Sequence, residues 1–442
     1  ILAQEGERRK TPRLPDRTLV SFLLCLLRCR AMRQSYAALV GLMLAHANIA
    51  SAKPKTRPDP KGHVATARWM AHTFTWGYLS TTSTRSEGTA RGVAFGNPYS
   101  FADVEGVPYF FASDLDASMI DLFASADAKP RASFTLTEAQ LTGTSASVPG
   151  CVIGDGFNDP ENPPCGRFVL TGKTVKLAAN TTEENMALKA LVARHPSFSQ
   201  YEGLGFYVVK MEVDSLWFID GYGGADYMKL SDYFGANLLL PPSHIPEVVG
   251  SGPPKPSDKV GTARWMAHTF TYGSLATTST RSQGSIVGDA FGNPYSFADV
   301  GGVPYFFASD LDASMIDLFT ASDANTSASF ALSEAQLKGD GEIAACKIGT
   351  GFNDPENPPC GRVVFSGQMQ KITANTKEEK DALAALTSRH PSFSQYEGLG
   401  FYVVKMIVSG IFFLNGYGGA DYMRLSDYFS YNATSTSVSL MV

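Results

Sequence analysis

Short runs of apolar and β-branched residues recur along the chain, and they predict a fold dominated by strands. The runs at 78–84, 107–113, 131–141 and 166–178 each have the length and composition of a strand. The run at 206–220 is longer and almost continuously apolar, which is typical of a strand that is covered on both faces. We therefore expect about six strands in this part of the chain.

Helical signals between these strands are few and short. Residues 63–73 and 118–126 predict two short helices. Thr181 followed by Glu184 forms a capping box that opens a third helix, which must end near Pro196. About six strands with a few short helices indicate an α+β, strand-dominated domain built on a closed or split β-barrel.

The same pattern occurs twice in the chain. The segment TARWMAHTFT begins at residues 66 and 262, and HPSFSQYEGLGFYVVKM begins at residues 195 and 390. Each copy spans roughly 170 residues, far more than the period of a solenoid, so the sequence indicates a duplicated domain. A stretch with six prolines separates the copies and is typical of a semi-extended linker. We divide the chain into an upstream segment at 1–31, a signal peptide at 32–52, a first domain at 53–234, a linker at 235–259, a second domain at 260–429 and a tail at 430–442.

The N-terminal part of the chain carries a targeting signal in place of a folding pattern. Residues 1–31 are rich in Arg, and we interpret them as an upstream or wrongly assigned segment. Met32 begins a stretch with a basic Arg33, a short apolar run and an Ala-Ser-Ala site, which is typical of a secretory signal peptide. An uncleaved membrane anchor is the alternative, but the apolar run is too short to span a bilayer. We expect the mature chain to begin at Lys53.

Charge argues against a nucleic-acid or membrane-surface partner. Residues 1–52 hold 8 Lys/Arg and 3 Asp/Glu, so the rest of the chain keeps 29 basic and 39 acidic residues and a net charge of −10. An acidic protein has no electrostatic attraction to DNA, RNA or an anionic bilayer. No apolar run of 18 or more residues lies in the body of the chain, so we expect no membrane span.

Four cysteines remain after the signal peptide, two in each copy at the same spacing. An even, paired count in a secreted protein indicates disulfides, and we expect Cys151 to pair with Cys165 and Cys346 with Cys360. Each local bridge closes a loop of about 15 residues and contributes about 3 kcal/mol in the chain-entropy relation. A zinc site is the alternative, but neither a Cys-x-x-Cys motif nor a suitably placed His accompanies the cysteines.

Three sequons, at Asn180, Asn325 and Asn432, favour N-glycosylation of a secreted chain. None of them recurs at the equivalent position of the other copy, so the glycans would be peripheral to any function that the copies share.

Two histidines recur in each copy, at 72 and 195 in the first and at 268 and 390 in the second. They are compatible with a catalytic role or with a hydrogen-bonded structural role. We favour the structural role, because the sequence holds no nucleophile elbow and no His-Glu-x-x-His motif.

An Arg beside hydroxyl side chains is the one candidate for ligand chemistry. Arg85 and its counterpart Arg281 follow a predicted strand within the segment TSTRS. An Arg with neighbouring Thr and Ser could hold a phosphate monoester by charge-assisted hydrogen bonds. The alternative is an Arg that is merely solvated at the end of a strand. Arg131 is replaced by Ser327 in the second copy, so a shared role for it is not supported.

Several ordered motifs resemble the CREG family of secreted glycoproteins. WGYLSTTST, GVPYFFASDLDASMIDL, GFNDPENPPC, VARHPSF and WFIDGYGGADY occur in the family's order, and the resemblance covers about 64–234 and 260–429. It implies a split β-barrel similar to flavin-binding pyridoxamine-phosphate oxidases. It also implies a secretory or endolysosomal, glycosylated and usually homodimeric protein without an established reaction.

The resemblance implies a flavin-phosphate pocket that is retained or vestigial in each copy. By position, its lining residues would be Thr82, Thr84, Arg85 and Ser113 in the first copy and Thr278, Thr280, Arg281 and Ser309 in the second. We expect no cofactor and no catalysis, with an FMN-dependent oxidoreductase as the alternative. The expected partner is a protein or receptor that the sequence does not identify.

The tandem arrangement departs from the family, because one chain carries both barrels. We expect the copies to pair within the chain as a pseudo-dimer, since related barrels pair through an apolar sheet face. A domain-swapped or intermolecular dimer of tandem chains is the alternative. The segments FYVVKM at 206 and 401 are identical, and we expect them to contribute to a near-symmetric contact.

Overall fold

The computed structural model describes most of the chain from residue 62 onward. The predicted upstream segment, the signal peptide, most of the linker and Asn432 lie outside the described residues. The described residues are 62–126, 128–140, 151–153, 157–201, 203–221, 224–236, 257–322, 324–336, 346–348, 352–396, 398–416 and 419–431.

The first copy folds into one antiparallel sheet of seven strands, in the order β2-β1-β5-β8-β9-β4-β3. The sheet curls into a split β-barrel, as the sequence predicts. Its strands are β1 (Trp76–Thr82), β2 (Ala94–Ser100), β3 (Ala102–Val104), β4 (Val107–Ser113), β5 (Arg131–Thr137), β8 (Arg167–Lys176) and β9 (Phe206–Ile219). Its helices are α2 (His63–Thr73), α3 (Ala117–Met119), η1 (Ile120–Ala124), η2 (Glu138–Gln140), α4 (Thr182–Arg194), η3 (Pro196–Tyr201) and α5 (Leu230–Gly235).

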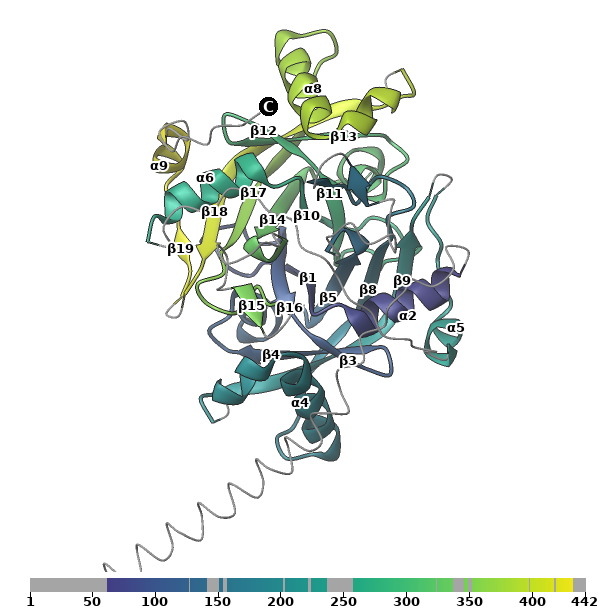
Figure 1. Cartoon of the computed structure of the whole chain (residues 1–442), viewed down its shortest axis with the longest axis vertical. Coiled ribbons are helices and arrows are strands. Elements are labelled where there is room, and N and C mark those ends of the chain that lie inside the picture. Colours follow the sequence, from purple (N-terminus) through teal and green to yellow (C-terminus); the bar gives the residue numbers. More distant parts are fainter. Residues whose placement is uncertain are drawn as a thin grey trace, which may run out of the picture. The chain divides into compact units, whose positions relative to one another are not determined.

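The second copy repeats this sheet in the order β11-β10-β14-β17-β18-β13-β12, with β19 added beside β18 (Figure 1). Its strands are β10 (Tyr272–Thr278), β11 (Ala290–Ser296), β12 (Ala298–Val300), β13 (Val303–Ala308), β14 (Ser327–Ser333), β17 (Arg362–Lys371), β18 (Tyr402–Leu414) and β19 (Asp421–Tyr422). Its helices are α6 (Lys259–Thr269), α7 (Ala313–Met315), η4 (Ile316–Thr320), η5 (Glu334–Gln336), α8 (Lys377–Arg389), η7 (Pro391–Tyr396) and α9 (Leu425–Ser430). Two small hairpins, β6 (Val152–Ile153) with β7 (Phe157–Asn158) and β15 (Lys347–Ile348) with β16 (Phe352–Asn353), form the cysteine loops.

The capping box predicted for the third helix is present. Thr181 Oγ1 accepts a hydrogen bond from the Glu184 backbone N–H at 3.2 Å, which satisfies one of the free donors of α4. Glu184 Oε2 in turn accepts from the Asn180 N–H at 3.3 Å, one residue before the cap. The helix ends at Arg194, two residues before Pro196, as predicted.

Aromatic side chains fill the interior of each barrel. In the first barrel Phe134 is fully buried, and its ring meets Phe101 at 4.7 Å and Phe110 at 5.0 Å between centroids, both edge to face. Edge-to-face pairs contribute about 0.5–1.5 kcal/mol beyond the area that they bury. Phe330, Phe297 and Phe306 repeat this arrangement in the second barrel at 4.8 and 4.9 Å.

The FYVVKM segment of the long strand β9 is covered on both faces, but by elements of its own barrel. Val209 lies in the barrel core, whereas Val208 packs with Leu191 of α4 and with Phe198. Figure 1 shows that α4 lies beside β3 and β4 and that α8 lies in the same way beside β12 and β13. The expectation that FYVVKM forms the contact between the barrels is therefore wrong, because α4 already occupies the face of this segment that the core leaves free.

The barrels meet instead through β1, β2 and β5 of the first and β10, β11 and β14 of the second (Figure 1). The Gly96 N–H donates to Ser329 Oγ at 2.9 Å, and the Gly292 N–H donates to Ser133 Oγ at 2.9 Å. A contact that recurs in both directions is isologous. A Cβ on Gly292 would lie 2.5 Å from Ser80 Oγ, so this close approach of the two barrels requires glycine.

Candidate functional site

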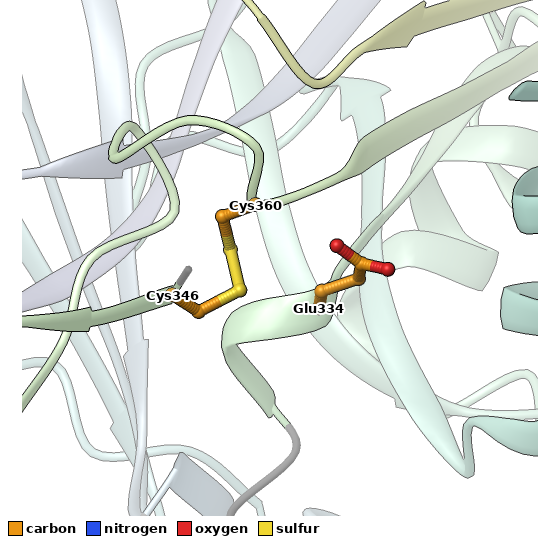
Figure 2. A group of neighbouring side chains, drawn as sticks. All are labelled: Glu334, Cys346 and Cys360. Carbon is orange, nitrogen blue, oxygen red and sulfur yellow. A yellow bond between two sulfur atoms is a disulfide. The ribbon is translucent and has the colours of Figure 1, made fainter. Parts of the chain in front are cut away.

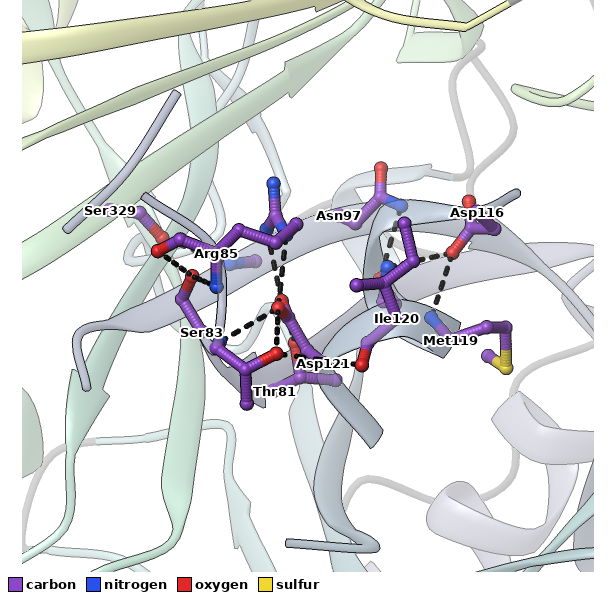
Figure 3. A network of polar contacts seen from close by, with 12 residues as sticks. Thr81, Ser83, Arg85, Asn97, Asp116, Met119, Ile120, Asp121 and Ser329 are labelled. Carbon is purple, nitrogen blue, oxygen red and sulfur yellow. Dashed lines mark hydrogen bonds and ion pairs between the residues drawn. The ribbon is translucent and has the colours of Figure 1, made fainter. Parts of the chain in front are cut away.

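The arginine that the sequence assigned to a phosphate is bound to a carboxylate of its own barrel (Figure 3). Arg85 follows β1, and its Nε and Nη2 donate to the two oxygens of Asp121, each at 2.9 Å. This is the bidentate geometry in which a guanidinium matches a carboxylate or a phosphate. Asp121 lies on the helical turn η1, and its side chain is fully buried.

Further donors converge on the same carboxylate. The Thr84 N–H donates to Asp121 Oδ1 at 2.9 Å, and Thr81 Oγ1 donates to Oδ2 at 3.1 Å. The Arg85 guanidinium lies 4.2 Å from the ring centroid of Phe95, which stacks a cation against an aromatic face. The anion that organises this end of β1 is therefore an aspartate of the chain.

The second barrel repeats the arrangement. Arg281 Nε and Nη2 donate to the two oxygens of Asp317 at 3.0 Å each, and the Thr280 N–H donates to Oδ1 at 2.9 Å. The guanidinium again lies 4.2 Å from an aromatic centroid, that of Phe291. Two independent copies thus hold the arginine in the same way.

Neither interpretation of Arg85 from the sequence describes its surroundings. Its side chain is 8% exposed, so it is not solvated, and two of its N–H directions are already used by Asp121. Thr84 contacts the same carboxylate, whereas Thr82 ends β1 and Ser113 ends β4, two strands that are not neighbours in the sheet. In the second barrel Thr280 donates to Asp317, the carboxylate that also binds Arg281. Thr278 ends β10, and Ser309 follows β13.

These residues do not fit a flavin phosphate as they stand. A phosphate monoester needs the donors that Asp121 and Asp317 now accept from. Binding would have to displace a buried carboxylate and leave it without its partner, which opposes the exchange.

A second polar cluster joins the cysteine loop of each barrel to the other barrel. From the second barrel, Asp354 accepts a hydrogen bond from Ser100 Oγ, and Glu356 Oε2 accepts from the Ser100 N–H at 2.9 Å. Asp354 Oδ2 also lies 3.1 Å from His195 Nδ1, and both side chains are fully buried. The loop thus contacts an edge strand and a helix end of the first barrel.

His195 contacts oxygen atoms through both of its ring nitrogens. Its Nδ1 faces the Asp354 carboxylate, and its Nε2 lies 3.0 Å from the Phe101 carbonyl oxygen. Both neighbours are hydrogen-bond acceptors, and they come from different barrels. The ring stacks on Phe198, with 4.8 Å between the centroids. The structural role expected for this histidine agrees with these contacts.

The reciprocal half of the interface carries the same groups. Asp159 accepts from Ser296 Oγ and lies 3.2 Å from His390 Nδ1. Glu161 Oε2 accepts from the Ser296 N–H at 2.9 Å. His390 Nε2 lies 3.0 Å from the Phe297 carbonyl oxygen.

The pKa values of these carboxyls are shifted in opposite directions. Burial raises the pKa of Glu356 to about 8, although Arg362 acts against this, and it raises the pKa of Glu161 well above its ordinary value. Burial also acts to raise the pKa of Asp354, but His195 and the donated hydrogen bonds outweigh it and leave that pKa lowered. One loop therefore carries both a readily ionised and a readily protonated carboxyl.

The structure joins Cys151 to Cys165 and Cys346 to Cys360, which are the local pairs that the sequence predicts. Figure 2 shows Glu334 on the turn η5 beside the second disulfide, and its carboxylate accepts the Gly361 N–H. Burial raises the pKa of Glu334 to about 7, against the effect of this hydrogen bond. Glu334 and the two sulfurs are close enough to share a metal ion, but sulfurs bonded to each other are not thiolate ligands.

Local sequence patterns do not reveal the partners that define both clusters. Asp121 stands 36 residues from Arg85 in the chain, and no spacing rule links the two. The motifs in the sequence assign no role to the acidic residues of the cysteine loop. Their exact recurrence in both copies, as FNDPENPP, was the available signal.

Comparison with known proteins agrees with the duplicated barrel. The family model described as CREG, beta-barrel matches residues 58–235 and 254–430. Protein CREG2 of Mus musculus is 31% identical over 195 residues, which cover 42% of this chain and 61% of that protein. Protein CREG1 of Gallus gallus is 30% identical over 199 residues, which cover 43% of this chain and 95% of that protein.

The chain spans about three fifths of the length of the CREG2 relatives it matches, at 61% for Mus musculus and 58% for Homo sapiens. Among solved structures, a heme binding protein from Mycobacterium smegmatis is 17% identical with a TM-score of 0.31. That alignment covers 55% of this chain and 90% of the other.

Proposed function

Because the chain belongs to the CREG β-barrel family, we propose that it is a secreted or endolysosomal glycoprotein that acts without catalysis, through contacts of its surface with a protein partner or receptor. The observation that carries this proposal is the pairing of Arg85 with Asp121 and of Arg281 with Asp317. In each barrel the arginine and one threonine of the expected flavin-phosphate set are held by a buried carboxylate.

Other features support the lumenal location. Two buried disulfides form readily in the secretory pathway and are rare in reducing compartments. Asn180 and Asn325 are exposed, as a glycan acceptor must be. None of the helices in the described part of the chain has the length and apolar character needed to cross a bilayer.

Internal pairing supports a single-chain state. The face that each barrel would use to pair with a second molecule is covered by the other barrel of the same chain. We therefore expect one chain to be monomeric, in place of the homodimer that a single barrel would form.

Measurements of bound and releasable FMN test the assignment of a function without catalysis. Secreted protein is purified, denatured to release any flavin, and titrated in its native form with FMN while the flavin fluorescence is followed. We expect no releasable FMN and no saturable binding at micromolar FMN. A stoichiometric flavin, or saturable binding that Arg85→Ala and Arg281→Ala abolish together, would replace the proposal with the oxidoreductase.

The location is tested by mass spectrometry of secreted material with and without glycosidase. We expect a mature N-terminus at Lys53 and a mass decrease on deglycosylation that maps to Asn180, Asn325 or Asn432. An intact segment from Met32 with no change in mass would contradict the lumenal assignment.

A further inference from the structure

One corner of the contact between the barrels carries an ion pair that joins them. Arg131, the first residue of β5, donates from Nε to Asp289 Oδ2 at 2.6 Å and from Nη2 to Asp214 Oδ2 at 2.7 Å. Asp214 lies on β9 of the same barrel, whereas Asp289 directly precedes β11 of the other barrel. The Asp289 side chain is 6% exposed and that of Arg131 27%, so the bond is largely withdrawn from water.

The symmetry-related corner has no such charges. In the duplicated sequence the equivalents of the three charged residues are Ser327, Ser409 and Val93. Ser327 Oγ accepts from Gln368 Nε2 at 3.2 Å and Ser409 Oγ donates to the Ser366 carbonyl at 3.3 Å, both within the second barrel. Val93 is buried. All three positions differ together, and the difference removes every charge of the trio.

Several contacts of the pairing face recur in both directions, although Tyr78, Ser80 and Thr135 are replaced by Ser274, Ala276 and Ala331 in the second barrel. The Gly96 contact with Ser329 recurs as Gly292 with Ser133, both at 2.9 Å. The acidic loop, its serine partner and its histidine also recur in both directions. A second copy of the same barrel would therefore find these recurring contacts as well.

The charged corner is where pairing of like barrels would leave a charge without its partner. Between two first barrels, Arg131 would face Val93 at both corners. Between two second barrels, Asp289 would face Ser327 and leave a nearly buried carboxylate without a cation. A desolvated charge without a partner opposes association, and such misfits are how interfaces reject a wrong partner.

We propose that Arg131, Asp214 and Asp289 are specificity determinants of the pairing face, which restrict its partner to the unlike barrel and exclude the like barrel of a second chain. A chain with two self-complementary faces would link one molecule to the next and build open assemblies. The trio removes this outcome, and the linker then favours the unlike barrel that is close at hand in the same chain.

The decisive variant gives the charged corner the residues of the uncharged one: Arg131→Ser, Asp214→Ser and Asp289→Val together. These side chains already fit the equivalent corner, so the variant is compatible with the fold. The full chain is unfolded in urea with its disulfides intact and refolded over a hundredfold range of protein concentration. Its molar mass in solution is then measured by light scattering. We expect the parent chain to return to the mass of one chain, and the variant to form at least about ten times more multi-chain species.

A matched control removes an ion pair elsewhere. Lys377→Ala with Asp381→Ala breaks an exposed i,i+4 pair on α8, and it should leave the distribution of masses unchanged.

Coupling across the interface is the second readout. The single changes Arg131→Ser and Asp289→Val and their combination form a double-mutant cycle, and we expect the pair to be coupled by about tenfold or more in the unfolding equilibrium. Additive single effects would overturn the proposal. Coupling without any change in the mass distribution of the triple variant would also overturn it, because the ion pair would then support folding without selecting a partner.

Discussion

Glu356 gives the contact between the barrels a dependence on pH that can be measured. Its carboxyl accepts the Ser100 N–H of the other barrel at 2.9 Å, and Arg362 lies 3.7 Å away within its own barrel. Burial raises the pKa of Glu356 from 4.5 to about 8, and the nearby carboxylates Asp354 and Asp116 add to the effect. We predict that Glu356→Gln, which imitates the protonated acid, removes part of the pH dependence of stability.

The sign and size follow from the pKa. Between pH 4.5 and about 8 the folded protein keeps a proton that the unfolded chain has released, so stability is highest at low pH and falls as pH rises. The full shift corresponds to roughly 5 kcal/mol. The Glu356 side chain keeps 16% of its surface exposed, so we expect about half of this, roughly 2–3 kcal/mol. Asp354 has a lowered pKa, and its contribution is lost only below about pH 4.

The assay is urea unfolding of the full chain at intervals between pH 5 and 8. We expect the free energy of unfolding of the parent to fall across this range, and that of Glu356→Gln to fall less steeply by up to about 1 kcal/mol per pH unit. Glu212→Gln changes an exposed carboxylate and should keep the parental slope. Equal slopes for the parent and Glu356→Gln would refute the assignment of a protonated, buried carboxyl.

Three further changes test the contacts described above. Asp121→Asn should lower the free energy of unfolding by about 3–5 kcal/mol, because it leaves a buried guanidinium without its counter-charge; a loss below about 1 kcal/mol would contradict the buried ion pair. Replacing Cys151 and Cys165 together by Ser should cost about 3 kcal/mol in urea unfolding, and no change in the transition would show that the bridge is not formed. Thr181→Ala should cost about 1 kcal/mol, measured by thermal unfolding, because α4 loses its cap.

The strands that the sequence predicts are those whose side chains are largely apolar or β-branched, such as β4 and β9. The strand β2 was missed because its sequence AFGNPYS contains Gly96, Asn97 and Pro98, which are typical of turns. In the structure β2 is the edge strand of the sheet, where proline is tolerated. The Pro98 carbonyl accepts a hydrogen bond from Arg362 of the other barrel at 3.0 Å. Its unusual composition therefore reflects a contact between barrels that local patterns do not encode.

The candidate site shows the same limit. The sequence shows that Arg85 has hydroxyl side chains beside it. Its partner Asp121 comes from η1, which the fold brings to the end of β1. Donor residues can be recognised from their chemistry. Whether a carboxylate of the same chain already accepts their hydrogen bonds depends on contacts between residues that are distant in the sequence.

The recurrence of the cysteine loop has a physical reason beyond the local disulfide that closes each loop. The Asp159 N–H donates to the Cys151 carbonyl at 2.9 Å, and the Cys165 N–H donates to the Asn162 carbonyl at 3.0 Å, so the disulfide closes a loop whose backbone is tied at both ends. Asp159 then contacts Ser296 of the other barrel. Since each loop serves the opposite barrel, a chain with one loop would hold only half of the contact. It follows that reduction of the disulfides should loosen the pairing of the barrels before it unfolds either sheet, because the strands themselves are joined without help from the bridges.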